Sequence, residues 1–179
     1  MDTKLEILEF PDKRLRKISR PVETFNDELR QLAEDMLLTM YQSMGIGLAA
    51  PQVNHQIRLI VIDISENRNE PMIFINPEIE KSNGKVESSE GCLSVPDIKT
   101  EVNRFESIDI KARTLEGEEV YMKADGLLSI CIQHEIDHLD GKLFIDYVSE
   151  IKLERLRKKI MKEKKALNYE VQKKSEHLI

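Results

Sequence analysis

The sequence predicts an α+β fold, with antiparallel or mixed β-sheets around a buried central helix and further helices near the N-terminus and the C-terminus. Apolar, β-rich segments separated by turn residues follow one another between residues 57 and 124, and segments with helical spacing lie before and after them. At 179 residues and 40% hydrophobic content, the chain is long enough to bury a core. We therefore expect residues 1–179 to form a single domain.

The first helix is predicted within the segment TFNDELRQLAEDMLLTMYQSM, residues 24–44. Its apolar residues recur at helical spacing and define one face, made of Leu29, Leu32, Ala33, Met36, Leu37 and Met40. Thr24 or Asn26 can cap its N-terminus, and Gly45 is placed to end it.

Strands are predicted at IRLIVIDI (57–64) and MIFINP (72–77), and NGK (83–85) indicates a hairpin turn. A second hairpin is predicted where FESIDIKA and EEVYMKA flank RTLEG (113–117). A short strand is expected at KLFID, residues 142–146.

The central helix is predicted over GLLSICIQHEIDHL, residues 126–139, because the segment is apolar on most sides. Asp125 stands at its N-cap position and Gly141 just beyond its end. A last helix is expected at about 149–166, followed by a polar tail.

The charge of the chain is unevenly distributed. The net charge is −6, but residues 151–179 hold ten Lys or Arg against four Glu, so the rest of the chain is strongly acidic. An acidic body argues against a general nucleic-acid-binding protein, and we expect no DNA partner. The basic helix has two interpretations: a solvated helix packed by an apolar stripe, which we favour, or a segment that binds a polyanion.

Membrane and export signals are not expected. The uncharged stretch 36–57 is interrupted by glycines and polar residues, unlike a membrane span, and the charged N-terminus lacks the apolar core of a secretory signal. The two cysteines, Cys92 and Cys131, are then expected to be reduced thiols, in the cytoplasm.

The segment QHEIDH, residues 133–138, carries the pattern H-E-x-x-H on the predicted central helix. His134 and His138 share one face of a helix and can bind one divalent ion, while Glu135 can reach a water beside that ion. This is the arrangement of two ligands and a general base. The alternative is an ordinary pair of structural histidines.

A catalytic metal needs a third protein ligand. Cys131 precedes His138 by seven residues, about 10 Å along a helix, too far for both to bind the ion that His134 binds. We therefore expect Cys131 to line the floor of a pocket. Cys92, after Gly91, completes a Cys-His-His set with an open fourth position, typical of catalytic sites. His55 and His177 are the other candidates.

The segment GIGLAAPQ, residues 45–52, is a glycine-rich loop. Gly45 and Gly47 allow the backbone to approach a ligand closely, and Gln52 can donate a hydrogen bond from its amide. The segment lacks the G-K-[ST] ending of a phosphate-binding loop. The alternative is a helix stop followed by a turn.

Together, GIGLAAPQ, EGCLS and QHEIDH resemble the three motifs of the peptide deformylase family, in the same order and each complete. The resemblance extends through FPDKRLRKISRPV, VNRFESIDI and DGLLSICIQHE to nearly the whole chain. It includes a cysteine that thermolysin-like peptidases lack.

The resemblance implies a hydrolase that removes the N-terminal formyl group from nascent polypeptides beginning with formyl-methionine and releases formate. It implies Cys92, His134 and His138 as metal ligands, with water as the fourth. It also implies Glu135 as general base and acid, with Gln52 and the Leu93 amide as oxyanion donors. The metal it implies is Fe²⁺; a thiolate with two imidazoles also suits Zn²⁺, Ni²⁺ or Co²⁺.

Further residues are expected to bind the substrate or support the site. The methionine side chain is expected in a pocket lined by Ile46, Leu127, Ile130 and Cys131. The peptide backbone can pair as an added strand near Gly47 and Gly91. Gly45 is expected to keep the site narrow, and Glu90 and Arg104 to form an ion pair that braces the cysteine strand.

Other functions stay open at this point. An H-E-x-x-H endopeptidase would cut internal amide bonds and would not need Cys92. A non-catalytic metal-binding module would not need Glu135. For the basic helix, the resemblance favours ribosomal RNA near the exit of the nascent chain as the polyanion.

Overall fold

The computed structural model describes residues 3–155, 158 and 160–162. The chain divides into two compact units, one ending at Phe144 and the other beginning at Ile145. In the second unit, residues 150–155, 158 and 160–162 are helical, in agreement with the expected C-terminal helix. The rest of that helix and the polar tail lie outside the described residues. A single domain over residues 1–179 stays a prediction.

Helix α1, Asp27–Gln42, forms where the helical spacing predicts it. Asn26 caps it, because its side chain accepts a hydrogen bond from the Leu29 amide at 3.0 Å. Helix α2, Gly126–Leu139, is buried along most of its length, as its apolar composition predicts. Asp125 stands at its N-cap position, but its side chain makes no capping hydrogen bond.

The strands form two antiparallel sheets. One has the order β1-β2-β3-β6-β7, and the other pairs β4 with β5. The strand bounds are β1 Gly47–Ala49, β2 Leu59–Ile62, β3 Met72–Asn83, β4 Val86–Cys92, β5 Val95–Arg104, β6 Ser107–Arg113 and β7 Glu119–Asp125.

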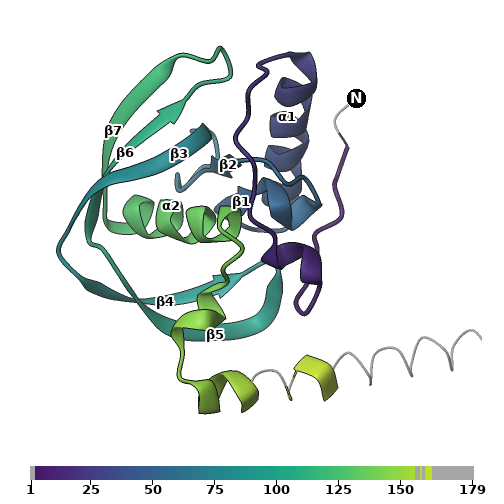
Figure 1. Ribbon diagram of the computed structural model, residues 1–179, viewed down its shortest axis with the longest axis vertical. Coiled ribbons are helices and arrows are strands. Elements are labelled where there is room, and N and C mark those ends of the chain that lie inside the picture. Colours follow the sequence, from purple (N-terminus) through teal and green to yellow (C-terminus); the bar gives the residue numbers. More distant parts are fainter. Residues whose placement is uncertain (1–2, 156–157, 159, 163–179) are drawn as a thin grey trace, which may run out of the picture. The chain divides into compact units, whose positions relative to one another are not determined.

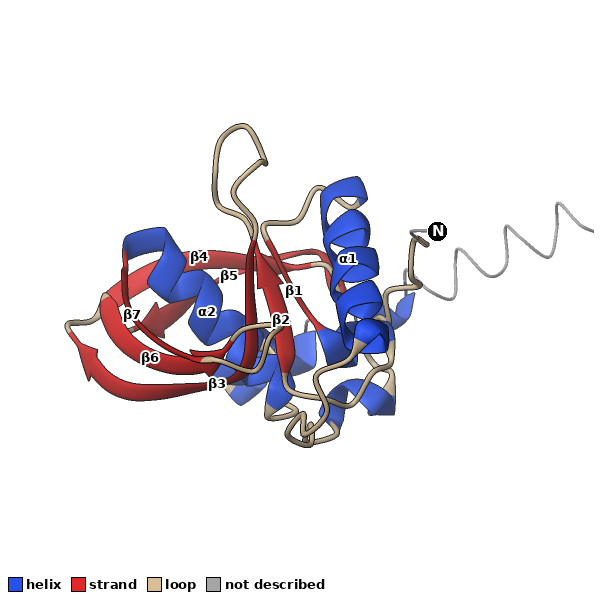
Figure 2. Cartoon of the chain, turned by 90° about the horizontal axis from the view of Figure 1, so that it is seen from above, coloured by secondary structure: helices blue, strands red, loops and turns tan. Residues whose placement is uncertain are grey.

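Helix α2 lies between the five-stranded sheet and the β4–β5 sheet (Figures 1 and 2). Successive side chains of β2 point to opposite faces of the sheet and pack in two different hydrophobic clusters. Ile60 and Ile62 pack in the cluster that contains the apolar side of α2, while Leu59 and Val61 pack with α1. All four side chains are fully buried. The α+β prediction with a buried central helix is therefore confirmed.

Three local predictions are wrong. Residues 83–85 do not close a hairpin, because β3 pairs with β6 and not with β4; they connect the two sheets. Residues 144–147 form a 3-10 helix, Phe144–Tyr147, where a strand was expected at 142–146. The expected loop 45–52 contains β1 and the start of a 3-10 helix, Ala50–Val53. A further 3-10 helix, Lys13–Arg16, precedes α1.

Among the described residues, no helix combines the length and the apolar character that a membrane crossing requires.

Candidate metal centre

The three predicted metal ligands lie together. Cys92 is the last residue of β4, and His134 and His138 are one turn apart on α2. One ligand atom from each of the three lies within 4.8 Å of the other two. The closest pair is Cys92 Sγ and His138 Nε2, at 3.2 Å. A strand end and a helix thus bring residues 42 to 46 positions apart to one point.

The chemistry of these donors fits a bound metal ion. His134 turns Nδ1 to the Glu90 carboxylate at 2.9 Å, so its Nε2 is left for an ion. A carboxylate on the second ring nitrogen fixes the tautomer and increases the donor strength of an imidazole. Both histidines are buried. One thiolate and two imidazoles suit Zn²⁺, Fe²⁺, Co²⁺ or Ni²⁺.

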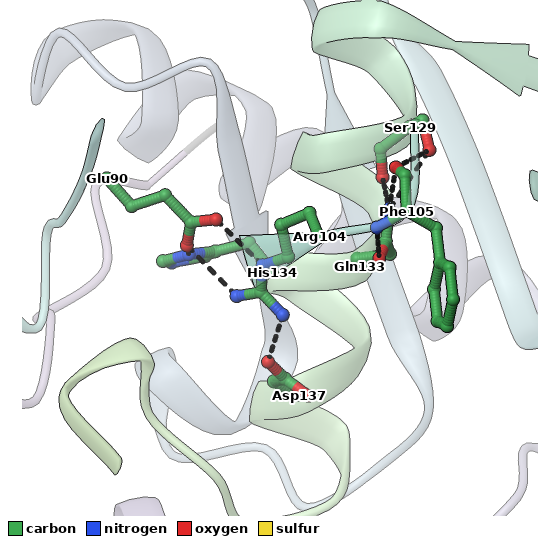
Figure 3. Close-up of polar contacts among 7 residues, drawn as sticks. All are labelled: Glu90, Arg104, Phe105, Ser129, Gln133, His134 and Asp137. Atoms are coloured by element: carbon green, nitrogen blue, oxygen red, sulfur yellow. Dashed lines mark hydrogen bonds and ion pairs between the residues drawn. The ribbon is translucent and has the colours of Figure 1, made fainter. Parts of the chain in front are cut away.

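Glu90 is itself held by Arg104 (Figure 3). Arg104 Nε and Nη2 donate to the two carboxylate oxygens of Glu90 at 2.7 and 2.9 Å, and both side chains are buried. Burial alone would raise the pKa of Glu90, but hydrogen bonds from Arg104 and His134 outweigh it and lower the pKa. The carboxylate beside His134 is therefore kept ionised.

The third guanidinium nitrogen of Arg104 binds Asp137, a partner that the sequence analysis did not predict. Arg104 Nη1 donates to Asp137 Oδ2 at 2.6 Å (Figure 3). Gln133, on the same face of α2, binds the backbone of Phe105. The spacing of Gln133 and Asp137 by four residues in QHEIDH was the available signal, but their partners are distant in sequence.

Glu135 is buried beside the ligands, with 4% of its surface exposed. Its Oε2 has no hydrogen-bond partner among the described residues. Burial raises the pKa of Glu135 to about 7, against the opposing charge of His134. A carboxyl group with a pKa in this range can accept and return a proton near neutral pH.

Gln52 is fixed by contacts at both ends of its amide. Its Oε1 accepts a hydrogen bond from the Ala49 backbone amide at 2.8 Å. Its Nε2 donates to Ser94 Oγ at 3.1 Å and lies 3.5 Å from Cys92 Sγ. The amide NH₂ group is thereby directed toward the metal ligands.

Gly47 and Gly45 allow close approach of the backbone, as expected. A Cβ at Gly47 would collide with Glu135 Oε1 and would lie 2.8 Å from Cys131 Sγ. A Cβ at Gly45 would lie 2.8 Å from Leu93 Cδ1. The backbone of β1 therefore passes directly over the carboxylate, and only glycine fits at position 47 without a shift of its neighbours.

These residues lie around a pocket of about 860 Å³. Its lining includes thirteen residues named from the sequence: Gly45, Ile46, Gly47, Gln52, Glu90, Gly91, Cys92, Leu93, Leu127, Ile130, Cys131, His134 and Glu135. Leu127 is half exposed, so it stands toward the rim. The sequence thus identified residues from α2, β4 and the β1 region that share one pocket.

The rejected ligand candidates lie elsewhere. The Cys131 thiol is buried, contacts the Ile46 carbonyl at 3.8 Å and lies outside the ligand group. His55 lines a different hollow, beside α1. His177 lies outside the described residues. Both cysteines are free thiols, in agreement with the expectation.

Comparisons with known proteins agree with this geometry. A family model described as Polypeptide deformylase matches residues 4–154. The chain belongs to the polypeptide deformylase family. It is 55% identical over 161 residues to a peptide deformylase of Pseudoalteromonas translucida, covering 90% of this chain and 96% of that relative.

Solved structures of the family are similar over most of the chain. A peptide deformylase from Legionella pneumophila is 46% identical, with a TM-score of 0.88, covering 93% of this chain and 98% of that chain. A peptide deformylase from Acinetobacter baumannii with Met-Ala-Ser bound is 33% identical, with a TM-score of 0.78, covering 83% of this chain and all of that chain.

Family membership decides between the functions that the sequence left open. The chain is a metal-dependent hydrolase that removes the N-terminal formyl group from nascent peptides. Cys92, His134 and His138 form the metal site typical of deformylases. The endopeptidase and the non-catalytic metal-binding module are therefore set aside.

Proposed function

We propose that deformylation proceeds at the floor of the 860 Å³ pocket, with Glu135, Gln52 and Leu93 as the catalytic residues. The observation that carries this proposal is the buried Glu135 carboxylate beside three converging metal ligands. The pocket leads from the surface to this carboxylate, so a peptide terminus can enter while the rest of the peptide stays outside.

Fe²⁺ is the metal that we propose for Cys92, His134 and His138, with Zn²⁺, Ni²⁺ or Co²⁺ as substitutes. The donor set supports each of these ions and excludes hard ions that prefer oxygen ligands. Such an ion supplies Lewis acidity and lowers the pKa of a water molecule.

Glu135 is the proposed general base and acid. It accepts a proton from the attacking water and returns it to the departing amine. Its environment supports this role, because burial raises its pKa to about 7 and Oε2 has no hydrogen-bond partner among the described residues.

Gln52 and the Leu93 amide are the proposed donors to the oxyanion that forms from the formyl oxygen. The Ala49 amide holds the Gln52 side chain so that its NH₂ group faces the Cys92 region. Since a fixed donor needs no reorganisation during the reaction, loss of one such donor commonly lowers kcat by about 100- to 1000-fold. Gln52→Leu is expected to lower kcat in this range.

The proposed substrates are peptides that begin with formyl-methionine. Ile46, Leu127, Ile130 and Cys131 offer an apolar lining for the methionine side chain. The relative with Met-Ala-Ser bound supports a substrate of this kind. We propose that the peptide backbone pairs near Gly47 and Gly91, which leaves later side chains exposed and varied.

The proposed compartment is the cytoplasm, where nascent chains are made. The ribosome is a proposed partner through the basic C-terminal helix, although part of that helix lies outside the described residues. Deletion of residues 149–179 tests this partner. We expect the truncated protein to pellet less with ribosomes; unchanged peptide turnover together with unchanged pelleting would contradict the proposal.

The function itself is tested with anaerobically prepared, iron-loaded protein and formyl-Met-Ala-Ser, by assay of formate. Acetyl-Met-Ala-Ser is the matched control, because its extra methyl group must occupy the narrow space beside Gly47. We expect rapid formate release and at most slow acetate release. Cleavage of internal peptide bonds without formate would overturn the proposal.

A further inference from the structure

Gln133 and Asp137 occupy one face of α2, next to the face that carries the histidine ligands. They are four residues apart, as His134 and His138 are, so the two pairs form neighbouring rows along the helix. Both residues are buried and polar, which calls for partners in the protein. Asp137 binds Arg104 at the end of β5, and Gln133 binds the backbone of Phe105 just after it (Figure 3).

Gln133 binds the backbone just beyond β5. Its Oε1 accepts from the Phe105 amide at 2.9 Å, and its Nε2 donates to the Phe105 carbonyl at 2.9 Å. The same Nε2 lies 3.0 Å from Ser129 Oγ, which also bonds the Phe105 carbonyl at 3.0 Å. An amide side chain thus replaces the strand partner that Phe105 lacks, and it fixes the backbone next to Arg104.

Asp137 binds the side chain of Arg104 itself. The guanidinium is divided between two carboxylates: Nη1 bonds Asp137 at 2.6 Å, while Nε and Nη2 bond Glu90. Glu90 Oε2 in turn meets His134 Nδ1 at 2.9 Å. A continuous series of hydrogen bonds therefore runs from Asp137 to a metal ligand.

Among the contacts described for this series, the carboxylates outnumber the guanidinium groups. Two carboxylates share one guanidinium, all three side chains are nearly excluded from water, and the electrostatic interaction between them is correspondingly strong. The negative charge of Asp137 offsets part of the positive charge of Arg104. Arg104 then compensates less of the Glu90 charge, and the electrostatic potential at His134 is more negative. A more negative partner makes an imidazole a stronger donor to a metal ion.

We propose that Asp137 is a positioning residue that increases the metal affinity of the site, and that Gln133 holds Arg104 where Asp137 can act. This inference rests on the proposed metal site at Cys92, His134 and His138. Asp137 touches neither the substrate nor the ion; it acts through Arg104 and Glu90.

The test compares Asp137→Asn with the wild type. Asparagine keeps the shape and an oxygen for Arg104 but removes the charge. Asp140→Asn is the matched control, because Asp140 lies close to the end of the same helix and pairs with Arg58 at 2.8 Å, away from Glu90. Zinc affinity of each protein is measured by competition with a chromophoric chelator, and the visible spectrum of the Co²⁺ form reports the ligand set.

We expect Asp137→Asn to weaken zinc binding by about 10- to 100-fold, the usual effect of losing such a partner, with Asp140→Asn near the wild type. Asp137→Glu, which restores the charge, is expected within about threefold of the wild type; if Asp137→Asn does not fold, a tenfold or greater loss in Asp137→Glu would overturn the proposal. Wild-type affinity in Asp137→Asn, or equal losses in the asparagine and glutamate variants, would overturn the proposal.

The wild-type Co²⁺ spectrum separates this inference from the proposed site. A thiolate-to-cobalt charge-transfer band that disappears in Cys92→Ala supports the site, whatever the result for Asp137. Absence of that band in the wild type would overturn the proposed ligand set and the role of Asp137 together.

Discussion

Gly47→Ala adds a single methyl group at the point where β1 crosses the Glu135 carboxylate. The new Cβ would lie 2.8 Å from Cys131 Sγ, about 0.6 Å short of the 3.4 Å at which ordinary contact begins, and it would come still closer to Glu135 Oε1. Both neighbours belong to the buried helix α2. The buried Cys131 thiol leaves no space for the methyl group on its side. The Glu135 carboxylate must therefore move.

The expected cost is mainly catalytic. A displacement of about 1 Å at a reacting group commonly costs on the order of 100-fold in rate. Gly47→Ala is therefore expected to lower kcat about 100-fold, with the metal content unchanged, since none of the three metal ligands is among the atoms closest to the new Cβ.

Gly45→Ala is the matched comparison. Its new Cβ would lie at the same 2.8 Å from Leu93 Cδ1, but this atom is the end of a flexible side chain and can turn away. We expect a clearly smaller loss of kcat. Formate release at saturating formyl-Met-Ala-Ser measures both variants at equal metal content. A kcat for Gly47→Ala within about twofold of the wild type would refute the positioning of Glu135 by this close contact.

Three more predictions concern the ligands, the buried cation and the acid stability. Cys92→Ala is expected to bind less than one metal ion per chain after dialysis, measured by elemental analysis; full occupancy would show that the thiolate is not a ligand. Arg104→Ala removes the guanidinium that binds the buried Glu90 and Asp137 carboxylates and is expected to cost about 3–5 kcal/mol in urea unfolding, whereas a cost near zero would contradict the network. For Asp63, burial raises the pKa, but hydrogen bonds from Ser65 and Tyr41 outweigh this and lower it. Its stabilisation is therefore present above the unfolded pKa of about 4 and is lost as the pH falls through the folded pKa. Asp63→Asn should remove this part of the acid dependence, and an unchanged profile of unfolding free energy against pH would be the contrary result.

The elements that were predicted correctly from the sequence are those that depend on contacts between residues close together in the chain. Asn26 caps α1 through a residue three positions away, and residues 113–117 connect two strands that pair with each other. The all-round apolar character of 126–139 was sufficient to place α2 inside the core. Each of these features depends on contacts within a short segment or on burial alone.

The wrong predictions depend on partners that are distant in sequence. Asn83–Lys85 has good turn residues, and Gly84 adopts a positive φ of 68°, but turn chemistry does not specify which strands pair. Strand β3 pairs with β6, although β4 and β5 lie between these two strands in the sequence. The run 142–146 is short and apolar, and such a run does not separate a strand from a 3-10 helix.

In the candidate site too, residues that act through nearby neighbours were predicted, and a residue with a partner distant in sequence was not. The ligand histidines and Glu135 could be proposed from helix geometry, and Cys92 from the need for a third ligand. Asp137 could not, because its role depends on Arg104, which is 33 residues away on β5. A polar residue next to a ligand motif has many ordinary explanations until its partner is known.

The most direct test of the central claim is formate release by Glu135→Ala and by the wild type, each confirmed to hold one metal ion per chain. With formyl-Met-Ala-Ser as substrate, the wild type should release one formate per peptide, and Glu135→Ala should be slower by at least about 100-fold, the smallest usual contribution of a general base. Equal rates at equal metal content would contradict the claim that the buried Glu135 carboxylate carries the proton in this reaction.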